Sequence, residues 1–364
     1  MRVIVIEPNN LNIIGDLDQY SYLLWETYYQ SPGKFQISCA KGARGSDLLQ
    51  VGNIIMAIDE LRARVGIIGY EDLTLDEEGN ERWNKQGYDL SGLLAYRVAM
   101  NKILNGATGG YDEQTNNAES LMRYYVNVEA INPTDTRRKI PFLTLGSNLN
   151  RGDTLTYRAR LQTLEEIIRE ISLVSGLGYQ IRLDLENKLF IFEALQGEDK
   201  SSVVKLSPNL GNVKSIEYMY DEMTSRNVAI VGGEGEGASR YFVVQEEDVS
   251  SSIRREVFVS ANDLPNNQLI QKGKETLEEM AEKMTLSCEF IPHGPFELGT
   301  DFNLGDFIQV SYPNVAEAIV RVAGIVEEWS REGKRMSLVL GKESQDIKML
   351  LRYYKKLFYA TSRR

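Results

Sequence analysis

The first hundred residues form a succession of short apolar and aromatic segments separated by polar turns. Residues 2–7 alternate in polarity before Pro8, and residues 20–29 are rich in the aromatic and branched side chains that favour strands. A turn signal of Ser, Pro and Gly follows at residues 31–33. Further segments of this kind lie at 34–38, 53–58, 64–70 and 81–90. The pattern predicts a β region.

From about residue 91 the pattern changes to one of helices and loops. Thr163 and Glu166 form a capping box that opens a helix, and Gly176 is placed to end it. Two strands are predicted after it, at 179–185 and 188–193, so this stretch is expected to be an α+β unit. The helix is predicted to bury one apolar stripe: Leu164, Ile167, Ile168, Ile171 and Val174.

The last third of the chain returns to β patterns, at 213–220 and 227–231. The second strand runs into glycine-rich residues 232–237, which match neither phosphate-binding motif and carry two glutamates that would repel an anion, so a loop is predicted. A helix is expected at 265–284, apolar at Leu269, Leu277, Met280 and Met284. Residues 347–358 form an amphipathic helical stripe: Ile347, Leu350, Leu351, Tyr354 and Phe358.

The first and last β stretches resemble each other. Residues 51–57 parallel 304–310, and residues 65–72 parallel 323–329. A polar hairpin with a glycine follows in each, and then a final strand. A real duplication predicts the same strand order in 50–92 and 303–341, as two related small antiparallel barrels. The alternative is a chance similarity between two β-meanders.

The expected fold class is mainly β with α+β insertions. It contains two related antiparallel, tube-type β-barrel domains and α+β domains. The predicted organisation is a first barrel at 1–100, an α+β domain at 101–205, a second barrel at 206–236 and 285–345, an inserted strand–helix segment at 237–284 and a C-terminal helix at 346–364.

Composition excludes several classes of function. The 364 residues carry a net charge of −11, which argues against wrapping nucleic acid. The single histidine, His293, cannot make a multi-histidine zinc site, and two distant cysteines, Cys39 and Cys288, are expected to be core residues. The N-terminus does not resemble a signal peptide, and no apolar run is long enough to span a membrane. We therefore expect no cofactor and no metal.

At the level of the whole chain, the sequence resembles the baseplate hub, or tail-associated, proteins of long-tailed bacteriophages and phage-like particles. The resemblance rests on residues 66–68 with the following hairpin to 89–94, the helix and hairpin at 163–193, and the segments 302–310 and 324–327. These features are residue patterns and their order along the chain, and they do not include a catalytic motif.

The resemblance implies a homotrimer whose two barrels per subunit form a pseudo-hexameric ring, which continues the DNA channel of the tail during genome ejection. It implies as partners the distal tail protein ring, the tape measure protein and a tail-tip spike, fibre or receptor-binding protein, with transiting DNA not specifically bound. The location would be the distal end of the tail in the virion, after synthesis in the bacterial cytoplasm. Because the chain stops at Arg364, a C-terminal lysin or fibre domain is expected to be absent or to lie on another protein.

Two groups of residues are candidates for subunit contacts. The aromatic Tyr22, Trp25 and Tyr28 could anchor an interface or fill a barrel core. The stripe with Ile347, Leu350 and Tyr354 could pack across a threefold axis or against its own subunit.

Two rival functions remain open on the sequence alone. A cell-wall or polysaccharide hydrolase needs only paired carboxylates, and Glu289, Glu297, Asp301 and Asp306 are candidates among 52 acids. A host-surface glycan-binding module would use exposed aromatic residues. Neither has a motif here, and His293 stands in a turn-rich loop without a nucleophile motif, so we interpret the chain as a structural hub without catalysis.

Overall fold

The chain divides into two compact units, Met1–Ile216 with Ser287–Glu343 and Glu217–Leu286 with the chain end. Each unit is described by itself. The computed structural model describes residues 1–60, 62–75, 79, 81–106, 110–221, 223–246, 253–262, 264–280, 283–291, 294–312 and 316–341.

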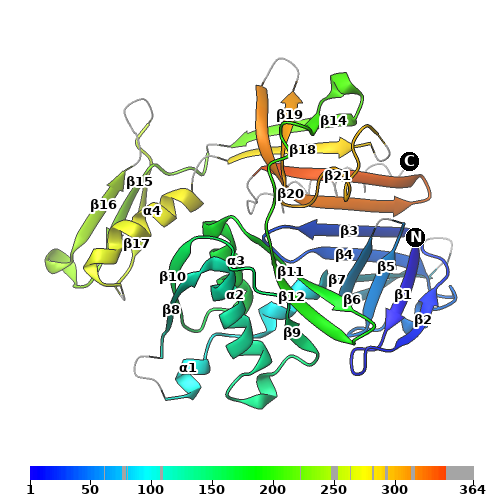
Figure 1. The fold of residues 1–364 in the computed structure, drawn as a ribbon, viewed down its shortest axis with the longest axis horizontal. Coiled ribbons are helices and arrows are strands. Elements are labelled where there is room, and N and C mark those ends of the chain that lie inside the picture. The colour runs from blue at the N-terminus through cyan, green and yellow to red at the C-terminus, as the bar shows by residue number, and fades with distance from the viewer. Residues whose placement is uncertain are drawn as a thin grey trace. The chain divides into compact units, whose positions relative to one another are not determined.

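A single large sheet, 13-stranded in the described part of the chain, forms the framework of the first unit (Figure 1). Its N-terminal strands are β1 (Arg2–Ile6), β2 (Ile13–Leu17), β3 (Tyr22–Tyr28), β4 (Lys34–Ala40), β5 (Ile54–Ile58), β6 (Ala63–Leu75) and β7 (Glu81–Asp89). Its later strands are β13 (Lys205–Leu206), β14 (Val213–Asp221), β18 (Lys283–Phe290), β19 (Phe307–Tyr312), β20 (Ala316–Ser330) and β21 (Gly333–Gly341). The order is β14-β18-β21-β20-β3-β4-β7-β6-β5-β1-β2, with β19 also beside β20 and β13 beside β19.

Strands β1 and β5 are buried on both faces, so residues 3–6 form a continuous apolar run and the predicted alternation in polarity along residues 2–7 is wrong. Along β1, Val3 and Val5 join one hydrophobic core with Leu23, Trp25 and other residues of the sheet. The alternate residues, Ile4 and Ile6, join a second core against the helices of the unit. Successive side chains of a strand point to opposite faces, so one apolar run serves two cores.

The prediction of two closed barrels is wrong for the described strands. Hydrogen-bond pairing runs as an open path from β14 to β2 and does not return on itself. Antiparallel pairing of β3 with β20 instead joins the two β regions edge to edge into one sheet. Such a pairing uses the main chain, and main-chain groups leave no side-chain signature in the sequence.

The predicted repeat of strand order is confirmed, and it extends further than expected. β5-β6-β7 and β19-β20-β21 are both antiparallel meanders. Two further strands continue the match, since β7 pairs with β4 and β4 with β3, as β21 pairs with β18 and β18 with β14. We call β3–β7 the first copy, and β14 with β18–β21 the second copy. The second unit is inserted between β14 and β18, where the first copy has only the turn at 29–33.

A shared glycine turn fixes the alignment of the two copies. Gly52 and Gly305 both have φ of 96°, a backbone conformation that favours glycine. The N–H of Gly52 donates to the Ile68 carbonyl at 2.8 Å, and that of Gly305 donates to the Val322 carbonyl at 2.8 Å. Ile68 is therefore equivalent to Val322, and both copies have a bulge at the next residue. The predicted alignment of residues 65–72 with 323–329 puts Ile68 opposite Val326 and is therefore wrong by four residues.

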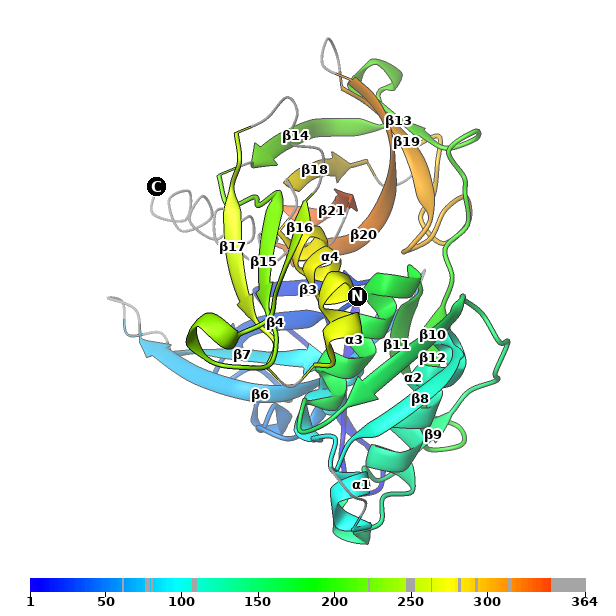
Figure 2. The same ribbon diagram turned by 90° about the vertical axis from the view of Figure 1, so that its left-hand side faces the viewer.

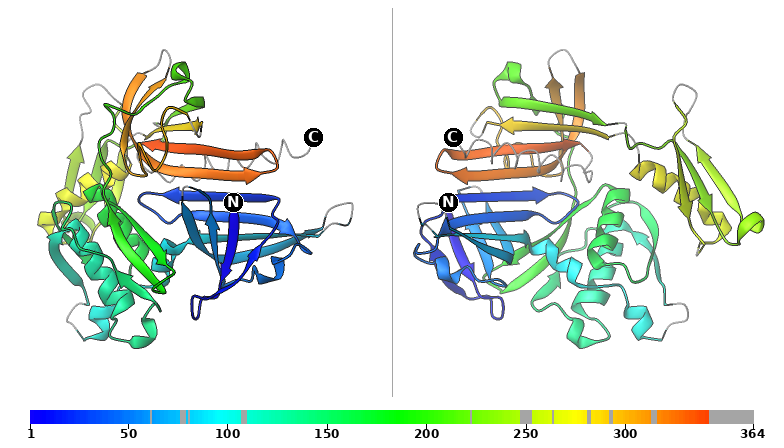
Figure 3. Two further views of the ribbon diagram at one scale, coloured as in Figure 1. Left: turned by 45° about the vertical axis from the view of Figure 1, so that its right-hand side comes forward. Right: turned by 180° about the vertical axis from the view of Figure 1, so that it is seen from behind.

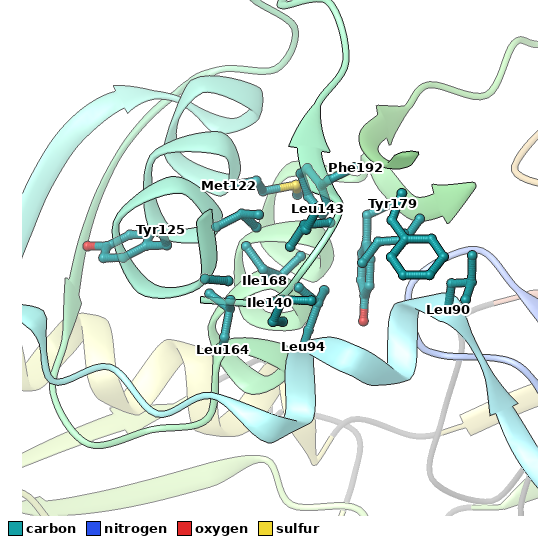
Figure 4. Packing of buried hydrophobic residues seen from close by; sticks show 14 of the residues in the cluster. Leu90, Leu94, Met122, Tyr125, Ile140, Leu143, Leu164, Ile168, Tyr179 and Phe192 are labelled. Atoms are coloured by element: carbon teal, nitrogen blue, oxygen red, sulfur yellow. The ribbon is translucent and has the colours of Figure 1, made fainter. Parts of the chain in front are cut away.

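An α+β layer covers one face of the sheet in this unit. Its residues share a core with β1 and β5, in which Met122, Tyr125, Ile168 and Phe192 are central (Figure 4). The predicted hairpin is confirmed as β11 paired with β12. The elements of the layer are α1 (Asn101–Leu104), β8 (Asp112–Asn117), α2 (Ala118–Val126), β9 (Leu143–Leu145), β10 (Thr154–Ala159), α3 (Leu164–Ser175), β11 (Gly178–Asp184) and β12 (Leu189–Leu195).

The predicted capping box of α3 is confirmed. The Thr163 hydroxyl accepts the Glu166 N–H at 3.2 Å, and the Glu166 carboxylate accepts the Thr163 N–H at 2.7 Å. Gly176, at φ 72°, ends the helix as expected. The stripe is buried as predicted except for Val174, which is 64% exposed because the core ends one turn before the helix does.

We expect Thr163→Ala to destabilise the protein by about 1 kcal/mol, because the main-chain N–H of Glu166 at the start of α3 loses its acceptor and the Glu166 carboxylate loses the hydroxyl it also accepts from. The free energy of unfolding in urea at neutral pH measures this. Thr163→Ser keeps the hydroxyl and should stay near the wild type. Equal losses in both variants would contradict the capping role.

The second unit is a three-stranded sheet with one helix packed over it (Figure 2). Leu269 and Leu277 on the helix bury against Ala229 and Val231, and the predicted glycine loop is a turn whose Gly232 and Gly233 carbonyls accept from Arg240. The predicted helix at 265–284 was too long, since Met284 lies in β18. The elements are β15 (Val228–Gly232), β16 (Phe242–Glu246), β17 (Glu256–Ser260) and α4 (Leu269–Glu279).

Candidate interaction surfaces

The joint between the two copies is an antiparallel strand ladder in the first unit. β3 lies antiparallel to β20 from Tyr22 opposite Ser330 to Tyr28 opposite Gly324. In both views of Figure 3 the orange and red strands of the second copy lie alongside the blue strands of the first. Residues 324–330 of β20 therefore have a neighbouring strand on both sides, β21 and β3.

A buried ionic cluster ties the copies together beside this ladder. Glu327 is fully buried and accepts two hydrogen bonds from Arg64, at 2.5 and 2.6 Å, and a third from Arg62. Lys334 lies 3.0 Å from Asp59 and 3.3 Å from Glu327, and Arg64 also donates to Asp59 at 3.0 Å. Two of the cations and Asp59 come from the first copy, and Glu327 and Lys334 from the second.

Burial raises the pKa of the Glu327 carboxyl, but the charges and hydrogen bonds of Arg62 and Arg64 outweigh it and hold that pKa below its usual range. Trp329 closes the cluster, with the Arg64 guanidinium 4.9 Å and the Lys334 ammonium 5.2 Å from its ring centre. The cluster has every group paired and serves as a structural lock between the copies.

The sequence of the chain matches that of a known family. Residues 3–342 match the sequence model of the Siphovirus ReqiPepy6 Gp37-like proteins. The chain belongs to this family. Membership confirms the resemblance to bacteriophage tail proteins drawn from the sequence. No curated protein sequence matches the chain.

Several solved structures of phage tail proteins are similar to this chain. The tail protein of Neisseria meningitidis MC58 is 14% identical, with a TM-score of 0.57 over 94% of this chain and 96% of that one. The 43 kDa tail protein of prophage MuSo2 from Shewanella oneidensis is 9% identical, with 0.58 over 94% and 98%. Prophage tail protein gp18 of Listeria monocytogenes EGD-e is 11% identical, with 0.54 over 99% and 100%. At these identities the likeness shows the fold.

The three aromatic residues predicted to make subunit contacts, Tyr22, Trp25 and Tyr28, lie on β3, the strand that pairs with β20. Trp25 is 2% exposed and stacks on Phe35 at 4.9 Å, inside the core of the first copy. Tyr28 is buried, and its hydroxyl donates to Glu26 at 3.1 Å, whereas Tyr22 is half-buried at the strand end. Their role between subunits stays a prediction. Ile347, Leu350, Tyr354 and His293 lie outside the described residues.

Three of the four carboxylates proposed for a hydrolase, Asp301, Asp306 and Glu289, are engaged in the fold. Asp306 is buried and accepts the N–H groups of Asn303 and Glu198, each at 2.8 Å, and Asp301 accepts the Glu297 N–H at 2.7 Å. Glu289 pairs with Lys214 at 2.8 Å. None of these contacts resembles a pair of carboxylates facing a substrate.

Cysteines and metal-ligating side chains are the other candidates for chemistry in this chain. Cys39 and Cys288 are free and buried, as expected of core residues. No group of three potential metal ligands occurs among the described side chains. Within the same residues, none of the helices has the length and apolar character needed to cross a membrane.

The residues that sequence reasoning missed are those of the ionic cluster. Arg62 and Arg64 are separated from Glu327 by more than 260 positions, and each lies in a segment that reads as an ordinary strand. Charged residues in alternating strands are usually solvated. Nothing in a single sequence indicates that the two arginines contact Glu327.

Proposed function

We propose that this chain is a structural hub of a phage or phage-like tail, which joins the sixfold tail tube to a threefold tip. The observation that supports this is the pair of matching five-strand copies, joined side by side within one chain by β3 and β20. Three such chains provide six similar units around one axis, whereas a sixfold tube ends on six identical ones.

The same proposal includes the partners and the channel. The ring would contact the distal tail ring on one side and a tail-tip spike, fibre or receptor-binding protein on the other, and would meet the tape measure protein in its bore. The net charge of −11 per chain would gather on the bore, where it repels the phosphate backbone and keeps DNA moving. The virion would be its place of action, at the distal end of the tail.

The proposal includes no catalysis. Phage tail tips can carry hydrolases, but three of the four candidate acids of this chain, Asp301, Asp306 and Glu289, are engaged with main-chain N–H groups or with a lysine. A hydrolase would keep two carboxylates free to face the glycosidic bond.

Particle mass and a low-resolution image test this function. The purified chain, or the particle that contains it, should show a threefold ring, with three times the 41.2 kDa of one chain. His293→Ala should leave assembly and infectivity unchanged. A monomer that degrades peptidoglycan, or loss of infectivity in His293→Ala with assembly intact, would contradict the proposal.

A further inference from the structure

The counterpart of the joint is open in the first copy. β6 is the equivalent of β20, and the matched Ile68 and Val322 align residues 70–75 of β6 with 324–329 of β20. Those β20 residues pair with strands on both sides. In the part of the chain that the structure describes, residues 70–75 pair with β7 alone, because β5 ends its pairing at Ile67.

Three of the six side chains on this open edge of β6, residues 70–75, are apolar and solvent-exposed, while the acidic Glu71 and Asp72 pair with Lys85 and Asn84 of the neighbouring β7. Tyr70 is 54%, Leu73 41% and Leu75 68% exposed. The positions equivalent to Leu73 and Leu75 are Glu327 and Trp329, which are 0% and 8% exposed. An apolar edge strand with unpaired main-chain groups is a template for another strand. The two positions that are buried on β20 of the second copy are therefore solvent-exposed on β6 of the first copy.

The second copy holds the strand that fits this edge. β14 is the equivalent of β3, because β14-β18-β21 repeats the order β3-β4-β7. β14 stands at an end of the described strand path, with β18 as its one neighbour among the described strands. Among the described strands of one chain, two strand edges therefore have no neighbouring strand, one on residues 70–75 of β6 and one on the side of β14 away from β18.

We infer that β14 of one chain pairs antiparallel with residues 70–75 of β6 in a second copy of the same chain, repeating the β3–β20 joint between subunits. The inference rests on the proposed hub function and names the surfaces through which the ring would close. The contact is head-to-tail, since the two surfaces differ, and a head-to-tail contact closes into a ring when its rotation permits.

The contact between chains differs in chemistry from the joint within one chain. Leu73 stands where Glu327 anchors the ionic cluster, so this contact has apolar side chains and a main-chain ladder in place of the lock. Salt should therefore weaken it little, because screening acts on exposed charges and not on apolar burial.

The first test blocks the open edge without touching the core. Leu73→Lys with Leu75→Lys changes two exposed side chains, so the monomer should keep its thermal midpoint while particle mass falls threefold, from trimer to monomer. The matched control is Leu149→Lys with Val203→Lys, which are 63% and 67% exposed and lie elsewhere in the unit. The control should stay trimeric. Mass photometry and thermal unfolding of the full chain supply both readouts.

The second test asks whether the contact is head-to-tail. Proline at Ser215 or at Ile216 removes one main-chain donor of β14, and adjacent residues of a strand direct their N–H groups to opposite sides. Of the two proline variants, the one that keeps the thermal midpoint of the monomer has lost the N–H that points away from β18. By itself this variant should be monomeric. Mixed with the Leu73→Lys, Leu75→Lys chain, it should form dimers, because one intact contact remains between them.

Each failure has a distinct meaning. A wild-type ring that survives the Leu73→Lys, Leu75→Lys change would overturn this inference and leave the hub function standing. A lowered thermal midpoint in the monomeric variant would show that the chain's own residues cover the edge, which also overturns it. A wild-type chain that forms no ring, alone or in particles, would overturn both.

Discussion

Glu327→Ala is expected to lower the free energy of unfolding by about 3–5 kcal/mol, because it leaves Arg64 buried without its carboxylate partner. Arg64 is 4% exposed and has donated two of its hydrogen bonds to Glu327. Lys334 and Arg62 also lose a partner, so cations from both copies are left facing one another. Urea unfolding of the full chain at neutral pH measures the loss.

A surface ion pair in the next turn supplies the control. Glu332 pairs with Arg335 but is 72% exposed, so Glu332→Ala should change stability by less than about 1 kcal/mol. Equal effects of the two alanine variants would show that the buried cluster is not a lock. Replacing Glu327 by Leu and Arg64 by Met together should recover much of the loss, since well-packed apolar residues can replace a buried ion pair.

The same cluster predicts how stability depends on acid. Burial raises the pKa of Asp59, but the Arg62 N–H, Lys334 and Arg64 outweigh it and hold that pKa well below its usual range, as the arginines do for Glu327. Groups with a lowered folded pKa stabilise the protein above their unfolded values, about 4, and lose this contribution as the pH falls through the folded values. Stability measured from pH 6 downward should therefore fall less steeply in Glu327→Gln than in the wild type.

Local features of the fold could be predicted where short-range chemistry decides them. Residues 20–29 do form a strand, β3, because aromatic and branched side chains suit a half-buried pleated surface. The capping box of α3 and its closing glycine depend only on neighbouring residues. The end of α4 was misplaced because the apolar spacing through Met284 fits a helix, whereas in the fold this residue belongs to a strand between two others.

The joint and the cluster could not be predicted for a different reason. The β3–β20 pairing and the Arg64–Glu327 contact both connect positions more than 260 residues apart, and one sequence does not show which distant positions meet. The repeat was visible, yet its alignment slipped by four residues, because glycine and branched residues recur within each strand. The decisive marker was the left-handed glycine turn, which has the same φ in both copies.

That pair of glycines leads to the second large effect, since Gly305→Ala should destabilise the protein far more than Gly52→Ala. Both substitutions force a side chain into the φ 96° conformation, at a cost of about 1–2 kcal/mol. A methyl group at Gly52 would meet open space, but at Gly305 it would lie 2.2 Å from the Tyr29 ring. Tyr29 cannot retreat easily, because its hydroxyl donates to the Leu195 carbonyl and accepts the Gly197 N–H, each at 3.0 Å.

We therefore expect Gly305→Ala to lose about 2 kcal/mol or more beyond the loss in Gly52→Ala, as overpacking of a filled site typically costs. Urea unfolding of the two variants side by side cancels the shared backbone term and isolates the contact with Tyr29. Tyr29→Leu in the Gly305→Ala background should relieve part of the clash. Equal losses of stability at the two glycines would mean that the Tyr29 side chain moves aside. The turn of the second copy would then accept a methyl group as readily as the turn of the first copy.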